Sequence, residues 1–255
     1  KENILFTNND TAYETAISLN NKGIKVNAIV DIRDANNSSL TNEVKKIGIK
    51  IYNSYTVINT KGYKKINKIT IMKLSKDGKT VTNSKTDIKC DCLGISGGWT
   101  PAVHLFTQSG GKLKFDDNDN IFIPNKYPSD QISIGSCNGN FDLEDIISSI
   151  NINLKDFLKI DKTNFENLKI NSSKPTSKKN IWLLPSDKPV AKTKSFVDFQ
   201  NDATAKDIKL ALREGFRSIE HVKRYTTTGM GTDQGKLGNM NALGIISDTS
   251  SVKMS

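Results

Sequence analysis

The first 31 residues carry the pattern that most restricts the fold of this chain. A short apolar run at Ile4–Phe6 is followed by apolar residues at helical spacing, in a helix that Asp10 or Thr11 can cap. The apolar run KVNAIVDIR comes next and gives a second strand that ends in Asp31. Two strands joined by a crossover helix run parallel. The stretch therefore predicts a βαβ unit of an α/β fold.

An acidic residue at the end of the second strand is typical of dinucleotide-binding folds, where it holds a ribose hydroxyl group. Asp31 stands at this position. The turn after the first strand reads Asn8-Asn9-Asp10, so it lacks the glycines that let a pyrophosphate approach the backbone. We therefore predict a Rossmann-type fold that has lost its nucleotide at this turn.

The next segment predicts a small antiparallel meander. The stretch KINKITIMKLSKDGKTVTNSKTDIK alternates polar and apolar residues, and Asp77-Gly78 marks a hairpin turn within it. An apolar strand, Cys92–Ser96, follows and runs into Gly97-Gly98. The segments IFIP and ISIGSCNGNFDLEDIISSI then predict strand, glycine turn and a helix that Asp142 caps. This order resembles the second half of a pyridine nucleotide–disulfide reductase-like flavoprotein.

Residues 151–195 are polar, carry three of the six prolines and are expected to form a linker. A compact helical segment follows it. Thr204-x-x-Asp207 predicts a capping box at the start of a helix that continues to Tyr225. Thr232 or Asp233 can cap a second helix. The predicted domains are therefore 1–150, reductase-like; 151–195, linker; and 196–255, a small all-α helix-loop-helix domain. The first of these is a three-layer, Rossmann-like domain with its meander.

The run GMGTDQGKLG, residues 229–238, joins the two expected helices. It has four glycines in ten residues, and it fits a loop that cradles an anion, a lost metal site or a tight interhelical turn. Only four of the 37 basic residues are arginines, and three of these lie at 213, 217 and 224. On one continuous helix they would form a stripe that leads to the loop. Because arginine suits phosphate and carboxylate, this clustering favours the anion site.

Composition excludes several other classes of function. The net charge is +10, but the basic residues are spread along the chain without a recognisable nucleic-acid-binding motif, so no nucleic-acid partner is expected. No apolar run reaches the roughly 18 residues of a membrane helix. The three cysteines, Cys90, Cys92 and Cys137, are too few for a disulfide framework and indicate a reducing compartment. We therefore expect a cytoplasmic protein without membrane association.

The string FVDFQNDATAKDI … REGFRSIEHVKRYTTTGMGTDQGK strongly resembles the alpha subunits of heterotetrameric sarcosine oxidases. FTNNDTAYETA, VDIR and SGGWTPAVHLFTQSGGK resemble the same subunits. The resemblance covers essentially the whole chain but only the middle of the family's subunit. The family's helical domain is similar to bacterioferritin-associated ferredoxins, which hold a [2Fe–2S] cluster with four cysteines. Here Asp198, Gln200, Asp233 and Gly238 stand at or near those positions, so we predict no cluster and no metal ligands.

The resemblance implies FAD in a beta subunit, FMN between alpha and beta, and NAD in the complete alpha subunit, with gamma and delta subunits as further partners. Sarcosine would be demethylated to glycine, the one-carbon unit would pass to tetrahydrofolate, and electrons would pass to dioxygen. The alternative is the scaffold subunit of an amino-acid dehydrogenase or another amine-oxidising flavoprotein. No catalytic residue is assigned, and the isolated chain is expected to be inactive. The residues proposed for the FMN site are Lys223, Arg224, Thr226, Thr227, Thr228, Gly229, Gly231, Gln234 and Lys236.

Overall fold

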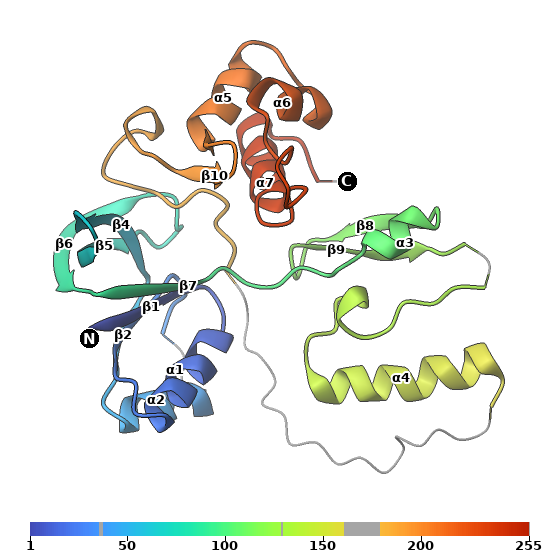
Figure 1. Ribbon diagram of the computed structural model, residues 1–255, viewed down its shortest axis with the longest axis horizontal. Helices are drawn as coiled ribbons and strands as arrows, with labels where there is room; N and C mark the ends of the chain where they lie inside the picture. Colours follow the sequence, from blue (N-terminus) through green and yellow to red (C-terminus); the bar gives the residue numbers. More distant parts are fainter. Residues whose placement is uncertain (36–37, 129, 161–178, 255) are drawn as a thin grey trace. The chain divides into compact units, whose positions relative to one another are not determined.

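The computed structural model describes residues 1–35, 38–128, 130–160 and 179–254 (Figure 1). The described chain forms two compact units. One unit contains residues 1–96 together with residues 179–254, and the other begins at Gly97 and contains residues 97–160 of the described part.

A four-stranded parallel sheet lies at the centre of the first unit, with the strand order β3-β2-β1-β7. Its strands are β1 (Asn3–Thr7), β2 (Val26–Asp31), β3 (Lys50–Asn53) and β7 (Cys92–Ser96). The last residues of β1, β2 and β7 are cross-strand neighbours, because Thr7 pairs with both Asp31 and Ser96. The predicted βαβ unit and the strand Cys92–Ser96 are therefore confirmed, and three strand ends meet at one edge of the sheet.

The sheet is the middle of three layers. The helices α1 (Thr11–Asn21) and α2 (Ser39–Lys46) cover one face, and the antiparallel strands β4 (Tyr55–Gly62), β5 (Ile66–Leu74) and β6 (Val81–Lys89) cover the other (Figure 1). Side chains alternate along β2, so Ile29 faces the helices while Val30 faces the meander. The predicted three-layer arrangement is confirmed, as is the hairpin turn at Asp77-Gly78 between β5 and β6.

The second unit contains α3 (His104–Gln108), β8 (Lys112–Asp116), β9 (Ile121–Lys126), η1 (Gly135–Asn138) and α4 (Leu143–Leu158). Asp142 caps α4, since its Oδ1 accepts hydrogen bonds from the backbone N–H groups of Glu144 and Asp145. The strand expected before Gly135 was wrong, because residues 132–134 have no regular structure. The helix also continues eight residues into the expected linker, and residues 161–178 of that linker lie outside the described chain.

The rest of the expected linker is irregular but not detached. We call residues 179–195 the connecting segment; it includes η2 (Val190–Lys192). Ile181 and Leu184 pack against the core of the sheet and meander, whereas Trp182 and Leu183 pack against the core of the helices that follow. The segment therefore contributes side chains to two hydrophobic cores in turn.

The C-terminal helices are α5 (Ala205–Arg213), α6 (Ile219–Thr226) and α7 (Asn239–Ser250), and a short hairpin, β10 (Phe196–Asp198) and β11 (Ala203–Thr204), accompanies them. The predicted capping box is confirmed, with the Thr204 N–H donating to Asp207 at 2.9 Å. The single helix expected from 204 to 225 was wrong. Gly215 has φ +97°, a left-handed conformation that ends α5 and separates Arg213 from the helix that carries Arg224. The arginines therefore do not share one helical stripe.

Candidate functional site

The glycine-rich loop, residues 227–238, connects α6 to α7 and is organised around Asp198. The carboxylate of Asp198 accepts hydrogen bonds from the backbone N–H groups of Gly229 at 2.7 Å, Gln200 at 2.8 Å and Asn201 at 3.1 Å. Asp198 is only 6% exposed. Burial alone would raise its pKa, but these donors stabilise the ionised form and hold the pKa below the ordinary value. The ionised carboxylate of Asp198 therefore holds the loop in place from inside the protein.

The four positions that resemble cluster ligands do come together. Gln200 Oε1 accepts a hydrogen bond from the Thr232 hydroxyl at 2.9 Å, next to Asp233, and Gly238 lies against the carbonyl group of Val197. Asp233 in turn accepts a hydrogen bond from the Gly235 N–H at 3.0 Å. Hydrogen bonds thus join the segments that a cluster would otherwise link. Within the described ranges, no group of three or more His, Cys, Asp or Glu side chains could hold a metal ion.

The backbone of the loop offers fewer donors than the sequence suggested. We expected Thr232 or Asp233 to cap the second helix, which would leave the first amides of that helix free to bind an anion. The helix begins at Asn239 instead, and most of the N–H groups of the loop before it donate to acceptors within the protein. The residues with such internally bonded N–H groups are Gly229, Met230, Gln234, Gly235, Lys236 and Gly238. Anion binding at this loop would therefore depend mainly on side chains.

The nine residues proposed for the site lie on α6 and the loop, but they differ in access. Thr226 and Thr228 are buried, and their hydroxyl groups hydrogen-bond to each other at 2.7 Å, so they support the loop from inside. Lys223 is half-buried, 3.7 Å from Glu220. The four proposed residues whose side chains are exposed are Arg224, Thr227, Gln234 and Lys236. Whether the set binds a ligand stays a prediction.

Two of the exposed side chains are cations that have no carboxylate partner among the residues the structure describes. Within the described part of the chain, no ion pair joins Arg224 or Lys236 to an acidic group. By contrast, Arg213 lies 4.0 Å from Glu214. A phosphate or a ring anion would supply the missing negative charge.

Exposed apolar side chains on the loop, on α6 and in the β10–β11 hairpin were not anticipated from the sequence. Phe199 is 73% exposed, Leu237 is 76% exposed, and Met230 and Tyr225 are about half exposed. For Met230 and Leu237 the available signal was a large apolar residue within a polar, glycine-rich stretch, because such a residue does not belong to the buried face of a helix. Exposed apolar groups, together with cations that have no carboxylate partner in the described ranges, suit a flat, anionic ligand or a partner surface.

A second cluster lies at the carboxyl edge of the parallel sheet, where the sequence placed the ribose-binding acid. The Arg33 guanidinium Nη2 lies 2.8 Å from Asp31 and 2.8 Å from Asp10, and the Tyr13 hydroxyl donates to Asp31 at 2.9 Å. Burial would lower the pKa of Arg33, but the two carboxylates raise it above its ordinary value. Burial and the charge of Asp31 likewise raise the pKa of Tyr13. Sequence reasoning missed Arg33, because a role for it depends on the turn and strand end being adjacent.

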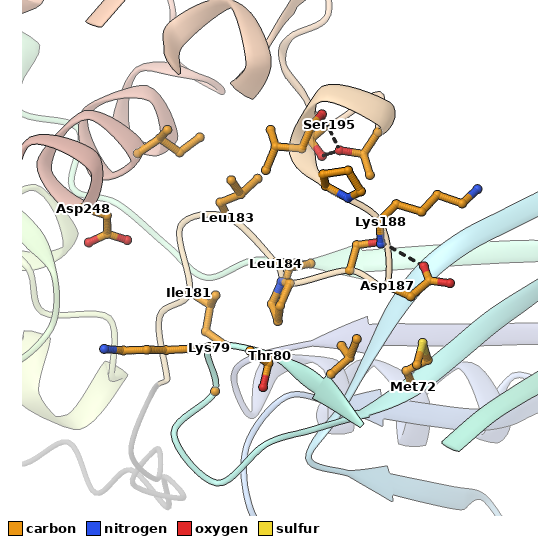
Figure 2. Close-up of a pocket in the computed structure, with 18 of the residues that line it drawn as sticks. Met72, Lys79, Thr80, Ile181, Leu183, Leu184, Asp187, Lys188, Ser195 and Asp248 are labelled. Carbon is orange, nitrogen blue, oxygen red and sulfur yellow. Dashed lines mark hydrogen bonds between the residues drawn. The ribbon is translucent and has the colours of Figure 1, made fainter. Parts of the chain in front are cut away.

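A groove with a volume of about 860 Å³ lies elsewhere in the first unit. Figure 2 shows Lys79 and Thr80 of the β5–β6 turn on one side of it, residues of the connecting segment, and Asp248 of α7. Its lining mixes lysines with Asp187 and Asp248, and none of the nine proposed site residues lines it. The groove therefore is not the candidate site. No helix in the described ranges is both long and apolar enough to span a membrane.

The parallel sheet, with helices on one face and the meander on the other, defines a three-layer, Rossmann-like α/β fold. The crystal structure of L-proline dehydrogenase from P. horikoshii shares this fold, with a TM-score of 0.57 at 19% identity, over 98% of this chain and 51% of that chain.

More specifically, the chain is homologous to sarcosine oxidase alpha subunits. It is 33% identical to "Sarcosine oxidase subunit alpha" of Rhizobium meliloti (strain 1021) over 95% of its length, and 28% identical to that of Corynebacterium sp. (strain P-1) over 95%. Residues 192–255 match the family model described as the sarcosine oxidase A3 domain. The predicted resemblance is confirmed. The chain spans 23% and 25% of the length of these two relatives.

Proposed function

We propose that this chain is part of the alpha subunit of a sarcosine oxidase, and that the exposed side of its glycine-rich loop forms one wall of an FMN site shared with a beta subunit. The homology to sarcosine oxidase alpha subunits supports the first part. The observation that carries the second part concerns Arg224 and Lys236: both are exposed, neither has a carboxylate partner among the described residues, and their chain neighbours Tyr225 and Leu237 are exposed apolar side chains.

The chemistry of these groups fits FMN. A flavin phosphate needs cations, and a reduced isoalloxazine anion gains from a positive neighbour, while the flat ring packs against apolar groups. Arg224 and Lys236 would bind the negative charge, and Phe199 and Leu237 would cover apolar surface and exclude water. Thr226, Thr228 and Asp198 would keep the loop in shape without touching the ligand. FMN, when bound, supplies electron transfer.

The complete assembly would oxidise sarcosine to glycine at an FAD of the beta subunit, pass the one-carbon unit to tetrahydrofolate and pass electrons to dioxygen. In that proposal this chain provides scaffold and a flavin wall, not the amine-oxidising site. Beta, gamma and delta subunits would complete a heterotetramer in the cytoplasm, and NAD would belong to the complete alpha subunit.

The test measures flavin content in the reconstituted complex. Arg224→Gln combined with Lys236→Gln is expected to lower FMN content several-fold and to leave FAD unchanged, because only the interface cations are removed. The matched control is Arg213→Gln combined with Arg217→Gln, which removes two exposed arginines away from the loop. Unchanged FMN in the loop variant, or equal loss in the control, would refute the FMN wall.

The other candidate function is that of a scaffold subunit in an amine dehydrogenase. The fold shared with the L-proline dehydrogenase structure is the observation that favours it. Turnover of the complex with sarcosine and with L-proline separates the two, because a sarcosine oxidase prefers sarcosine and reduces dioxygen. A preference for proline would favour the dehydrogenase.

A further inference from the structure

The carboxyl ends of β1 and β2 are the part of this fold in which a dinucleotide would be held. In dinucleotide folds the diphosphate lies at the N-terminus of the first helix, and an acid at the end of the second strand binds the ribose. Here the corresponding positions are the turn 8–10 before α1 and Asp31 at the end of β2.

A guanidinium already connects these two positions. Arg33 Nη2 bonds Asp10, at the N-terminus of α1, and Asp31, each at 2.8 Å, and Arg33 Nε lies 3.1 Å from both oxygens of Asp31. The three residues are 5%, 7% and 1% exposed, so solvent scarcely reaches them. The carboxylate of Asp31 is therefore occupied by the side chain of Arg33.

The turn is closed on its other side by Asn9. Its Nδ2 donates to Ser96 Oγ at 3.1 Å, at the end of β7, and its Oδ1 accepts from the Thr11 N–H at 3.0 Å. The amide of the first residue of α1 is thus satisfied, and the turn is tied to a neighbouring strand. Asn8 donates in addition to Asn180 of the connecting segment at 3.2 Å.

We propose that Arg33 and Asp10 act as a built-in ligand of this fold, which closes it to pyridine dinucleotides. Asp10 brings a carboxylate to the helix start where a diphosphate would lie, and Arg33 takes the acid that would bind the ribose. The cluster of Asp10, Asp31 and Arg33 holds two carboxylates and one guanidinium group, so its net charge is negative. This charge repels the phosphates of both NAD and NADP. Any NAD of the complete alpha subunit, as proposed above, binds outside residues 1–96.

Hydrogen–deuterium exchange of the natural full-length protein tests this, with NAD⁺ or NADP⁺ at about 1 mM, which half-fills even a site of millimolar Kd. Peptides covering residues 5–11 and 29–34 are expected to exchange at the same rate with and without nucleotide. Slower exchange in either peptide would overturn the proposal. Protection in other peptides only would agree with it. FMN content is a separate readout, so failure of the proposed flavin site leaves this result interpretable.

A variant gives a second, independent readout. Arg33→Met removes the built-in cation at similar length, and the amides of both peptides are expected to exchange faster by a factor of at least about ten. The amides of α4 serve as the internal control, because they lie in the second unit, outside the unit that contains Arg33. Unchanged exchange in residues 5–11 and 29–34 would show that Arg33 does not close the carboxyl ends of β1 and β2.

Discussion

The carboxylate of Asp198 and the backbone N–H of Gly229 are joined by a 2.7 Å hydrogen bond across 31 residues of chain. This contact fixes the glycine-rich loop to the hairpin that precedes α5. The Gly229 amide is therefore occupied by Asp198, and the proposed binding of a flavin relies on the outward side chains of the loop.

Asp198→Asn should lower the free energy of unfolding at pH 7 and should weaken the dependence of that free energy on pH in the acid range. The pKa of Asp198 is depressed from its ordinary value of 3.8, so its contribution is present above the unfolded-state pKa and is lost as pH falls through the lower folded-state pKa. Replacement of one acceptor oxygen by an amide group is expected to cost about 1–3 kcal/mol at pH 7. Urea denaturation between pH 7 and about pH 2 measures both effects.

The control for this experiment is Asp248→Asn, at an exposed site on α7. It should leave the free energy of unfolding at pH 7 within about 0.5 kcal/mol of the natural protein. An Asp198 variant with the same acid profile as the natural protein would contradict the role of the carboxylate.

Arg33→Met should destabilise the first unit strongly, because it leaves Asp10 and Asp31 buried without their cation. Breaking such a buried pair costs about 3–5 kcal/mol, measured as the free energy of unfolding. Lys65→Met breaks an exposed pair with Asp91, 3.5 Å apart, and should cost at most about 1 kcal/mol. Equal costs for the two variants would show that burial of the Arg33 cluster does not matter.

Gly244→Ala should disturb the contact between α7 and the connecting segment. A Cβ at this position would overlap the indole ring of Trp182, and such overpacking costs about 1–3 kcal/mol. The double variant Gly244→Ala with Trp182→Leu should be less destabilised than the sum of the two single variants. Strict additivity in thermal or urea unfolding would argue against direct contact.

Gly215→Ala tests the break between α5 and α6. Gly215 has φ +97° and open space around it, so its substitution carries a backbone cost of about 1 kcal/mol without a clash. Gly97→Ala, also in open space but without a positive φ, should be near neutral. If one continuous helix ran through residue 215, alanine would instead raise helicity and stability, as circular dichroism and urea unfolding would show.

The layers of the fold were readable because they depend on local periodicity. The βαβ unit, the hairpin at Asp77-Gly78 and the capping box at Thr204 each arise from a few adjacent residues. The break at Gly215 was missed because apolar residues at 208, 212, 216 and 219 keep helical spacing across it. Periodicity records which residues face a core and does not reveal a left-handed residue between them.

The candidate site was only partly predictable for a different reason. The sequence identified the loop, the positions Asp198 and Gln200 that correspond to the first pair of cluster ligands, and the absence of thiols at the four ligand positions. It could not show that the Gly229 amide serves Asp198, or that Asp31 serves Arg33, since both depend on contacts set by the fold. In both places a side chain of the protein itself occupies the group that the sequence pattern assigned to a ligand.

The connecting segment has a consequence for how this chain can change in evolution. Ile181 and Leu184 face one core, and Trp182 and Leu183 between them face another. A one-residue insertion or deletion within these four positions would shift side chains from one core toward the other. Length variants should therefore be tolerated on either side of residues 181–184 far better than within them.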